Sequence, residues 1–279
     1  MSAMHPGTAA QVNRADEIEA MAWGALFDAM PAPMRAHTGA RVEYVHDATL
    51  LLTPGIPIAF FNRAMGLGSR EPVTAAAIGS VVDAFKTAGV KSFMVHSDHT
   101  TQCKGVLSRM FDSAGLVPFA ARPAWSKFLR DGQPAPNAET SLSLREATSE
   151  DASALASALV AAHDLPKEME AWIRAMVGHP HLRCYALADG PHIVGGGVLF
   201  VKDTCAWLGL GGTLVSHRRR GGQKAVMARR IADAIALGAR DIATETGEPR
   251  GEEPNPSWSN MHKSGFQIVS SRKNWVTRA

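Results

Sequence analysis

An arginine- and glycine-rich turn, residues 218–222, is the part of the sequence best suited to bind a charged ligand. It stands between the end of a β-rich run and the start of a helical pattern at about Gly222. The start of a helix presents unpaired backbone N–H groups and the positive end of the helix dipole, and both favour phosphate. Gly221 and Gly222 lack a Cβ atom, so an anion can approach the backbone closely. The three arginines before them suit a pyrophosphate or a 3′-phosphate, so the turn predicts a nucleotide cofactor.

The residues around this turn exclude two common nucleotide-binding motifs. A P-loop ends in Gly-Lys-Ser or Gly-Lys-Thr, whereas Gly222 is followed by Gln223-Lys224-Ala225, which lacks a metal-binding hydroxyl. These glycines do not form the dinucleotide fingerprint GxGxxG, and no acidic residue closes a following strand at the usual distance. The cofactor is therefore expected to be of another kind.

The turn resembles the cofactor motif of the GNAT superfamily of N-acetyltransferases, (Arg/Gln)-x-x-Gly-x-(Gly/Ala). Arg218 and Gly221 match this motif, and Gln223 stands where the family usually has Gly or Ala. A bacterial subset with Arg-Gly-Arg-Gly-Ala-Gln is similar. The alternative is an exposed basic helix start, with Arg229 and Arg230 on a solvated face.

Segments on both sides of the turn strengthen the resemblance. Residues 255–266 resemble the last helix of the family and the Gly-Phe pair that follows it, here Gly265-Phe266. Residues 195–197 and 204–215 resemble the hairpin of the third and fourth strands. The match covers about residues 141–279.

By this resemblance the cofactor is acetyl-CoA (coenzyme A), and no metal takes part. The family binds the pantetheine arm between two splayed strands and the pyrophosphate on the amides of the turn. An amide near Thr213 would polarise the thioester carbonyl. The positions that match the cofactor site are Gly211, Gly212, Thr213, Arg218, Arg219, Arg220, Gly221, Gly222, Gln223, Lys224 and Asn260.

The resemblance also implies roles for residues near the reacting groups. Glu245, on the expected strand 241–246 beside the cofactor gap, is the candidate catalytic base; its alternative is a solvated strand-end carboxylate with an arginine partner. Many family members have a Tyr as general acid where this chain has Met261, and the adjacent His262 is more typical of polar surface. Trp207 on the fourth strand is the candidate for substrate binding, although a Trp there is also typical of a core.

A segment with Gly, two prolines and no hydrophobic period, residues 131–140, predicts a linker between two units. The first, 1–132, is expected to be a degenerate GNAT-like domain, because 66–72 stand where the arginine turn should be. The second, 141–279, is expected to be the acetyltransferase domain, able to bind acetyl-CoA by itself. Both units have strands, helix, strand, helix and strand in that order, which favours an internal duplication over two unrelated domains. The predicted fold class is α/β (α+β), with two GNAT-like units, each a mixed, mostly antiparallel twisted sheet flanked by helices.

Hydrophobic periods and turn residues predict the elements of both units. Helices are expected at 17–30, 73–87, from Thr100 or Thr101 to Gly115, after a cap at Ser149, and at 168–177, 222–237 and 257–263. Strands are expected at 48–52, 58–62, 91–95, 124–129, 143–146, 181–188, 193–201, 204–215, 241–246 and 267–269.

Composition limits the other classes of function. The chain is 46% hydrophobic and 20% charged, as in globular proteins, and its net charge of +3 is too small to argue for nucleic acid. Three cysteines imply no disulfide framework. No run approaches the ~18 apolar residues of a membrane span, and no signal core begins the chain, so a cytoplasmic protein without membrane contact is expected. His96, His99 and Cys103 have a spacing that zinc could use, but no fourth ligand is evident.

The expected activity is transfer of an acetyl group from acetyl-CoA to a primary amine of a small molecule or amino acid. One alternative is a catalytically idle acyl-CoA sensor, which the missing Tyr permits. Another is a protein or peptide N-acetyltransferase, which requires a peptide groove. The expected partners are the amine and, as a homodimer, a second copy of the chain.

Overall fold

Twelve strands form one mixed sheet in the described part of the chain. The computed structural model describes residues 7–98, 104–121, 124–249, 251, 253 and 255–278. The strands are β1 (Arg41–Val45), β2 (Ala48–Leu52), β3 (Arg63–Met65), β4 (Met94–Asp98), β5 (Leu116–Pro118), β6 (Ala124–Arg130), β7 (Ser143–Glu146), β8 (Leu182–Asp189), β9 (His192–Lys202), β10 (Cys205–Thr213), β11 (Asp241–Gly247) and β12 (Gln267–Thr277). Their order in the sheet is β1-β2-β3-β4-β12-β6-β11-β10-β9-β8-β7, and β5 also pairs with β12.

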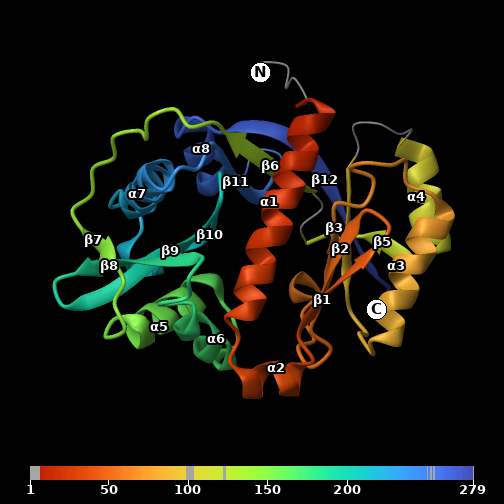
Figure 1. The fold of residues 1–279 in the computed structure, drawn as a ribbon, viewed down its shortest axis with the longest axis horizontal. Coiled ribbons are helices and arrows are strands. Elements are labelled where there is room, and N and C mark those ends of the chain that lie inside the picture. Colours follow the sequence, from red (N-terminus) through yellow and green to blue (C-terminus); the bar gives the residue numbers. More distant parts are fainter. Residues whose placement is uncertain are drawn as a thin grey trace.

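Helices cover this sheet and fill the angle between its two ends. They are α1 (Ala9–Asp28), α2 (Ala32–Thr38), α3 (Ala75–Thr87), α4 (Lys104–Ser113), α5 (Ala152–His163), α6 (Glu170–Ala175), α7 (Gly222–Ala236) and α8 (Pro256–Lys263), with short 3-10 turns η1 (Ala59–Phe61), η2 (Lys167–Met169) and η3 (Val215–His217). Helix α1 lies lengthwise between the two ends of the sheet (Figure 1). No helix in the described ranges is long and apolar enough to cross a membrane.

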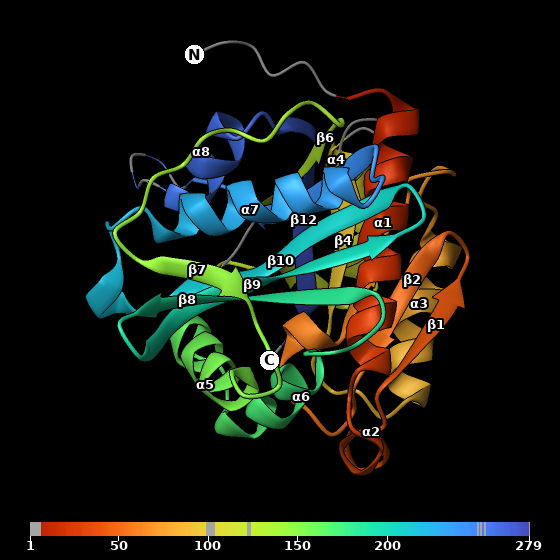
Figure 2. The same ribbon diagram turned by 60° about the vertical axis from the view of Figure 1, so that its left-hand side comes forward.

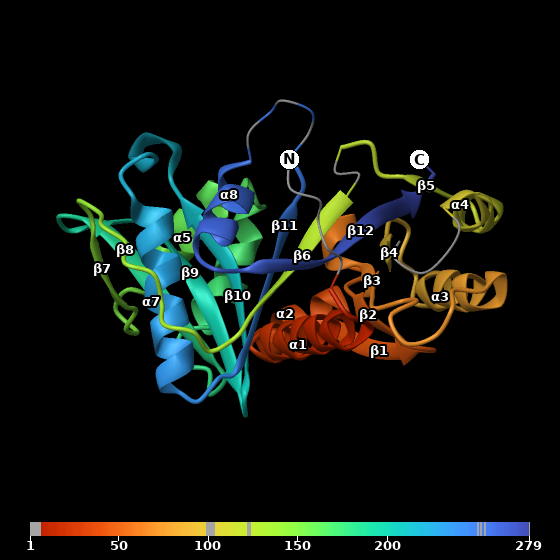
Figure 3. The ribbon, with the colours of Figure 1, turned by 90° about the horizontal axis from the view of Figure 1, so that it is seen from above.

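The helices of each half pack on that half's strands. In the second half, α5 and α6 lie on one side of β8–β10 and α7 on the other (Figure 2). In the first half, α3 and α4 cover β1–β5 at the opposite end of the molecule (Figure 3). Helix α1 contacts β10 and β11 of the second half as well as β6 and β12, so it belongs to both.

The same strand pattern recurs in both halves. In the second, β8, β9 and β10 are antiparallel neighbours, and β10 pairs in parallel with β11 after helix α7. In the first, β1, β2 and β3 are antiparallel, and β3 pairs in parallel with β4 after α3. A parallel pair needs such a crossover helix. The predicted fold class is confirmed, and the recurrence agrees with an internal duplication.

The two halves exchange strands. Strand β6, which precedes the linker, lies between β11 and β12 and pairs antiparallel with both. Strand β12 then continues into the first half, where it pairs with β4 and β5. Residues 141–279 alone would lack the strand between β11 and β12. A truncated second unit is therefore unsuited to testing cofactor binding, and the whole chain is required.

Most predicted elements are present within a few residues, and the exceptions have local causes. The predicted strand 58–62 is instead η1 and a turn, because the buried Asn62 side chain accepts a hydrogen bond from Thr53 N (2.7 Å) and donates to Ile56 O (2.8 Å). Asp151, not Ser149, is the N-cap residue of α5, and its carboxylate accepts from Thr148 N.

Two more predictions concern the ends of elements. The last strand extends far beyond 269, to Thr277, because it crosses from β6 to β4. The predicted caps Thr100 and Thr101 lie outside the described residues.

The predicted linker, residues 131–140, has no regular secondary structure. The Arg130 guanidinium donates to carbonyl oxygens of the linker at Asp131, Gln133 and Pro134.

A buried cluster of charged side chains joins α1 to strands of both halves. Glu19 on α1 pairs with Arg63 on β3 (3.1 Å), Lys127 on β6 (3.0 Å) and Arg272 on β12 (3.0 Å). Asp16, one turn earlier, also pairs with Lys127. Burial raises the pKa of Glu19 to about 7, against the opposing effect of Arg272. Because a buried charge without partners is costly, these pairs tie α1 to the strand exchange.

We predict that Arg272→Met lowers the free energy of unfolding by about 3–5 kcal/mol at about pH 8, because Glu19 loses a buried partner. Without Arg272 the pKa of Glu19 rises further, so the loss grows as the pH rises above about 7. Urea denaturation measures this. Arg70→Met is the matched control, since Arg70 pairs with Glu17 at 3.1 Å in an exposed position. This variant is expected to lower the free energy of unfolding by less than about 1 kcal/mol.

A double variant, Arg272→Met with Glu19→Met, separates the lost charge partner from lost packing. It is expected to be more stable than Arg272→Met alone, because no carboxylate is left with too few partners. Equal losses in Arg272→Met and Arg70→Met would show that the cluster does not secure α1.

Candidate functional site

The predicted cofactor turn lies between β10 and the N-terminal end of α7. Arg219 and Gly221 have φ angles of 64° and 79°, so the backbone passes through the left-handed region before the helix begins. Gly221 is the N-cap residue, and no side chain of the described residues caps α7. The first N–H groups of a helix have no acceptor within it, so those of α7 are available to an anion.

The three arginines of the turn have different roles. Arg220 donates two hydrogen bonds to the Asp189 carboxylate, the shorter at 2.6 Å, so its charge is paired within the protein. Arg218 donates from Nε to a backbone carbonyl of β10 at 3.3 Å. Arg219 and, in the first turn of α7, Lys224 are exposed. The positive charge open to a ligand therefore comes mainly from Arg218, Arg219 and Lys224.

Packing within the protein requires glycine at both positions of the turn. A Cβ on Gly221 would overlap the carbonyl oxygen of Glu139 in the linker, and one on Gly222 would overlap the side chain of Leu187. An acidic substitution at Gly221 would therefore disturb the turn itself. A charge change on an exposed side chain of the same turn tests phosphate binding more cleanly.

Gln223, which departs from the family motif, links α7 to α8. It is helical, and its Nε2 donates to Ser257 Oγ at 2.8 Å. Asn260 Nδ2 donates to Gln223 Oε1 at 2.7 Å. The backbone amide of Gln223 thus stays at the helix start, while the Asn260 side chain, predicted to bind the cofactor, is bonded to Gln223.

Strands β10 and β11 separate at the level of this turn. In the described residues their parallel pairing ends where Trp207 lies opposite Ala243. Beyond that point β10 bulges between Gly209 and Gly212, with Leu210 at a φ of 49°, and continues beside β9. The gap implied between the fourth and fifth strands is present. The predicted cofactor residues on this stretch of β10 are Gly211, Gly212 and Thr213.

Arg230, on α7, supports the bulge of β10. Its buried guanidinium donates to the carbonyl oxygens of Val198 and Gly209, each at 2.9 Å. Burial lowers the pKa of Arg230 to about 10, so it is still charged at neutral pH. A Cβ on Gly197 would lie 2.9 Å from the guanidinium carbon, so this approach requires glycine. Arg229, in contrast, is exposed and pairs with Asp233.

Arg230 was not predicted as a site residue, although its position in the helical pattern indicates that it is buried. Position 230 lies on the same helix face as the buried residues Val226, Met227 and Ile231. An arginine on a buried face needs acceptors, and here these are the carbonyls at the strand opening.

A cavity of about 550 Å³ opens where the two strands separate. It brings together the predicted residues Trp207, Gly211, Gln223 and Glu245. It also reaches aromatic rings of the first half, from α1, η1 and β6: Trp23, Phe60, Phe61 and Trp125. No sequence motif marks these rings, because nothing in their own segments shows that they face the second half.

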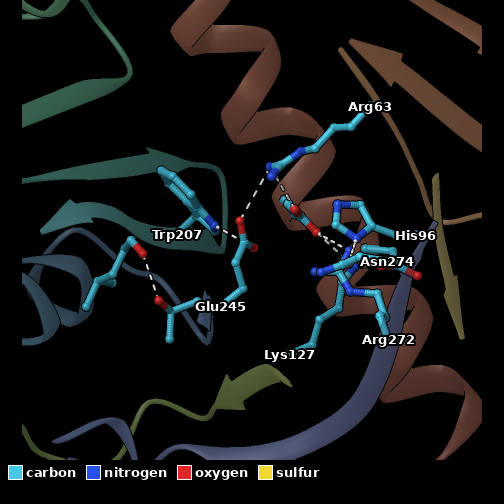
Figure 4. A network of polar contacts seen from close by, with 11 residues as sticks. Arg63, His96, Lys127, Trp207, Glu245, Arg272 and Asn274 are labelled. Carbon is cyan, nitrogen blue, oxygen red and sulfur yellow. Dashed lines mark hydrogen bonds and ion pairs between the residues drawn. The ribbon is translucent and has the colours of Figure 1, made fainter. Parts of the chain in front are cut away.

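Glu245 lies at this cavity and points from β11 toward Arg63 (Figure 4). Its Oε1 is 3.5 Å from Arg63 Nη2, and its Oε2 accepts a hydrogen bond from Trp207 Nε1 at 3.4 Å. Burial alone would raise the pKa of this carboxyl, but Arg63, Arg272 and Lys127 together lower it. Glu245 is therefore an ionised carboxylate at neutral pH. It is buried rather than solvated, and its arginine partner comes from the first half.

Solved structures share the fold that positions this site. A GCN5-related N-acetyltransferase from Kribbella flavida matches with a TM-score of 0.62 and 14% identity, over 95% of this chain and 96% of its own. One from Sphaerobacter thermophilus matches with a TM-score of 0.59 and 14% identity, over 83% of this chain and 80% of its own. The chain has the fold of the GCN5-related N-acetyltransferases.

A tandem GNAT protein from the clavulanic acid biosynthesis pathway is also similar, with a TM-score of 0.51 and 14% identity over 82% of this chain and 78% of its own. No family model matches the sequence, and no curated protein has a detectably similar sequence. At these identities the likeness shows the GNAT fold and leaves the acceptor substrate undetermined.

The other predicted site residues of this GNAT fold are placed as follows. Trp207 is both core and cavity wall: it is buried, its ring lies 6.0 Å from that of Trp23, and it lines the cavity. Met261, at the position of the family's Tyr, also lines the cavity, so no phenol is present there. His262 is exposed and packs against the Trp258 ring at 4.2 Å.

The first half has a turn before α3 that corresponds to the turn before α7. Side chains of the first half accept hydrogen bonds from the backbone N–H groups of this turn. The Asp47 carboxylate accepts hydrogen bonds from the backbone N–H groups of Gly68 (3.0 Å), Arg70 (3.2 Å) and Glu71 (3.4 Å). Thr74 caps α3 by accepting from the third residue of that helix. These amides are satisfied internally, which distinguishes this turn from the one before α7.

Of the three candidate zinc ligands, only His96 belongs to the part of the chain that the structure describes. His96 is buried, and its Nδ1 lies 2.7 Å from Asn274 Oδ1, while burial lowers its pKa well below the usual value. His99 and Cys103 lie outside the described residues.

We predict that Lys224→Glu raises the Kd for acetyl-CoA about tenfold at low salt, because it reverses a charge beside the expected pyrophosphate. A carboxylate in the first turn of a helix is favourable, so the fold should persist. Isothermal titration calorimetry measures the affinity. Arg240→Glu, just after the C-terminal end of α7, makes the same net charge change and should bind normally; equal weakening in both variants would place the phosphates elsewhere.

We also predict that the intact chain binds one acetyl-CoA, not two. Of the two corresponding turns among the described residues, the one before α7 has no side-chain cap, whereas Asp47 and Thr74 accept from backbone N–H groups at the one before α3. The stoichiometry from the same titrations tests this. A value of two would mean that the Asp47 carboxylate yields its place to a phosphate.

Proposed function

We propose that this protein is an N-acetyltransferase that transfers an acetyl group from acetyl-CoA to a primary amine of a small molecule. The observation that carries the proposal is the separation of β10 from β11 beside an uncapped helix start, with an ionised carboxylate at the same cavity. The uncapped start of α7 suits phosphates, and the carboxylate at the cavity suits an amine.

The residues around the strand opening fit acetyl-CoA, which supplies an acyl thioester activated toward amines. In the proposal, the N–H groups at the start of α7 bind the pyrophosphate, and Arg218, Arg219 and Lys224 add positive charge. The unpaired edge of β10 from Gly211 to Thr213 binds the pantetheine arm as an added strand. An amide near Thr213 stabilises negative charge on the carbonyl oxygen.

The chain also offers a way to remove the proton of the amine. Glu245 attracts an ammonium group, which must lose a proton before its nitrogen can attack. Glu19 contacts the same Arg63 nitrogen as Glu245, at 3.1 Å against 3.5 Å, so the two carboxylates are neighbours. Glu245 lines the cavity and is the candidate acceptor of that proton, whereas Glu19 is not among the residues that line it. The described cysteines, Cys184 and Cys205, are buried thiols and are not needed as nucleophiles.

An acyl-CoA sensor is the second candidate, and Met261 at the cavity favours it, because the family's usual acid is missing. A peptide N-acetyltransferase is less well supported, since a cavity of about 550 Å³ matches small-molecule sites of roughly 300–1,000 Å³. Release of free thiol from acetyl-CoA in the presence of amines separates the enzyme from the sensor.

We predict that Glu245→Gln lowers turnover by about 10²–10⁴-fold with little change in acetyl-CoA affinity. Because the pKa of Glu245 lies below its usual value, the carboxylate is ionised throughout pH 6–9 and gives no step in the profile there. Wild-type turnover should instead rise with pH as the amine loses its proton, and the defect of the variant should shrink. Steady-state thiol release at several pH values measures both effects.

Trp207→Phe is the matched positioning control for this variant. It keeps an aromatic ring but removes the N–H that donates to Glu245, so its defect should be smaller than that of Glu245→Gln. Thermal unfolding confirms that both variants fold. Wild-type turnover in a folded Glu245→Gln protein would remove this carboxylate from the mechanism and leave catalysis to orientation.

A further inference from the structure

The acceptor end of the cavity is built from aromatic rings of four different elements. Trp23 lies on α1, Phe60 on η1, Trp125 on β6 and Trp207 on β10. The ring centroids of Trp23 and Phe60 are 5.5 Å apart, those of Phe60 and Trp125 are 5.5 Å apart, and those of Trp23 and Trp207 are 6.0 Å apart. All four rings line one cavity, so a ligand there meets aromatic surface on several sides.

One carboxylate lies among these rings in a fixed position. Glu245 is 5% exposed, and its two oxygens are held separately by Arg63 Nη2 and Trp207 Nε1. Arg63 is itself fixed, because its guanidinium lies 4.5 Å from the Trp23 ring centroid and 4.3 Å from that of Phe60. A rigid carboxylate beside aromatic faces favours a cationic head group that is joined to a flat apolar body.

Among the described residues that line the cavity, Arg230 is the only arginine or lysine. Arg230 lines it, but its guanidinium is bound to the carbonyl oxygens of Val226, Val198 and Gly209. His163 stands exposed next to Asp164, and both residues line the cavity. A carboxylate on the ligand would therefore lie near Glu245 or Asp164 without an unpaired arginine or lysine beside it, which is costly.

We infer that the acceptor is a primary amine joined through a short chain to an aromatic ring, with no carboxylate on the carbon that bears the nitrogen. This inference rests on the proposed function. The amine lies at Glu245, and the ring lies among Trp23, Phe60, Trp125 and Trp207. Amino acids, including aromatic ones, are excluded by the same carboxylate that recruits the amine.

Three amines that differ in one feature each test the inference on the intact protein. Phenethylamine has the ring and the amine, phenylalanine adds a carboxylate, and ethylamine lacks the ring. With saturating acetyl-CoA, kcat/KM for phenethylamine should exceed that for ethylamine by about 10- to 100-fold, the effect of burying one phenyl group. It should exceed that for phenylalanine by at least about 100-fold, because of the unpaired carboxylate.

A variant and a binding measurement support the comparison. Phe60→Ala, at a half-buried position, should reduce the preference for phenethylamine over ethylamine about tenfold. Phenethylamine should change the tryptophan fluorescence of the protein, since three indoles line the site, and phenylalanine should not.

The possible failures can be told apart. If acetyl-CoA binds but no amine releases thiol, the proposed function is wrong. If amines are acetylated but ethylamine or phenylalanine equals phenethylamine, the proposed function stands and the inference is overturned. An unchanged preference in a folded Phe60→Ala protein would likewise overturn the placement of the ring.

Discussion

The separation of β10 from β11 is the constraint on which the rest of the site depends. A strand that leaves its neighbour exposes backbone groups that must find other partners. On β10 the Gly209 carbonyl is bound by Arg230, and pairing with β9 resumes at Gly212 and Thr213. Glycine at 197 leaves room for the guanidinium. The opening is thus stabilised by contacts within the protein.

The exchange of β6 and β12 determines what lies at this opening. It brings the first half against the second, so that Trp23 and Trp125 lie in the same cavity as Glu245. The buried pairs of Glu19 with Arg63 and Arg272 fix α1, and therefore the Trp23 ring, relative to strands of both halves. A half without a cofactor motif thus contributes aromatic rings that line the cavity and Arg63, which helps to keep Glu245 ionised.

The two corresponding turns of the duplicated pattern differ in which side chains accept hydrogen bonds from their backbone N–H groups. Before α3, Asp47 and Thr74 accept the N–H groups that an anion would otherwise bind. Before α7, the cap is Gly221, which has no side chain to offer. The same architecture therefore gives one helix start without a side-chain cap and one closed turn, and a single internal carboxylate accounts for much of the difference. The arginines divide in the same way, since Arg220 is paired with Asp189 while Arg219 is exposed.

Features that depend on neighbours along the chain could be predicted from the sequence. The turn at Gly221, the start of α7, the linker and the lack of a Tyr at Met261 all follow from glycine positions, helix period and local motifs. The partners of Glu245, the aromatic wall and the strand exchange could be identified only in the folded chain. Glu19 and Arg272 are 253 residues apart in the sequence, and a strand such as β6 has the same local pattern whichever neighbours it pairs with. Local propensity selects the type of an element, whereas its partners are selected by burial and charge pairing between distant segments.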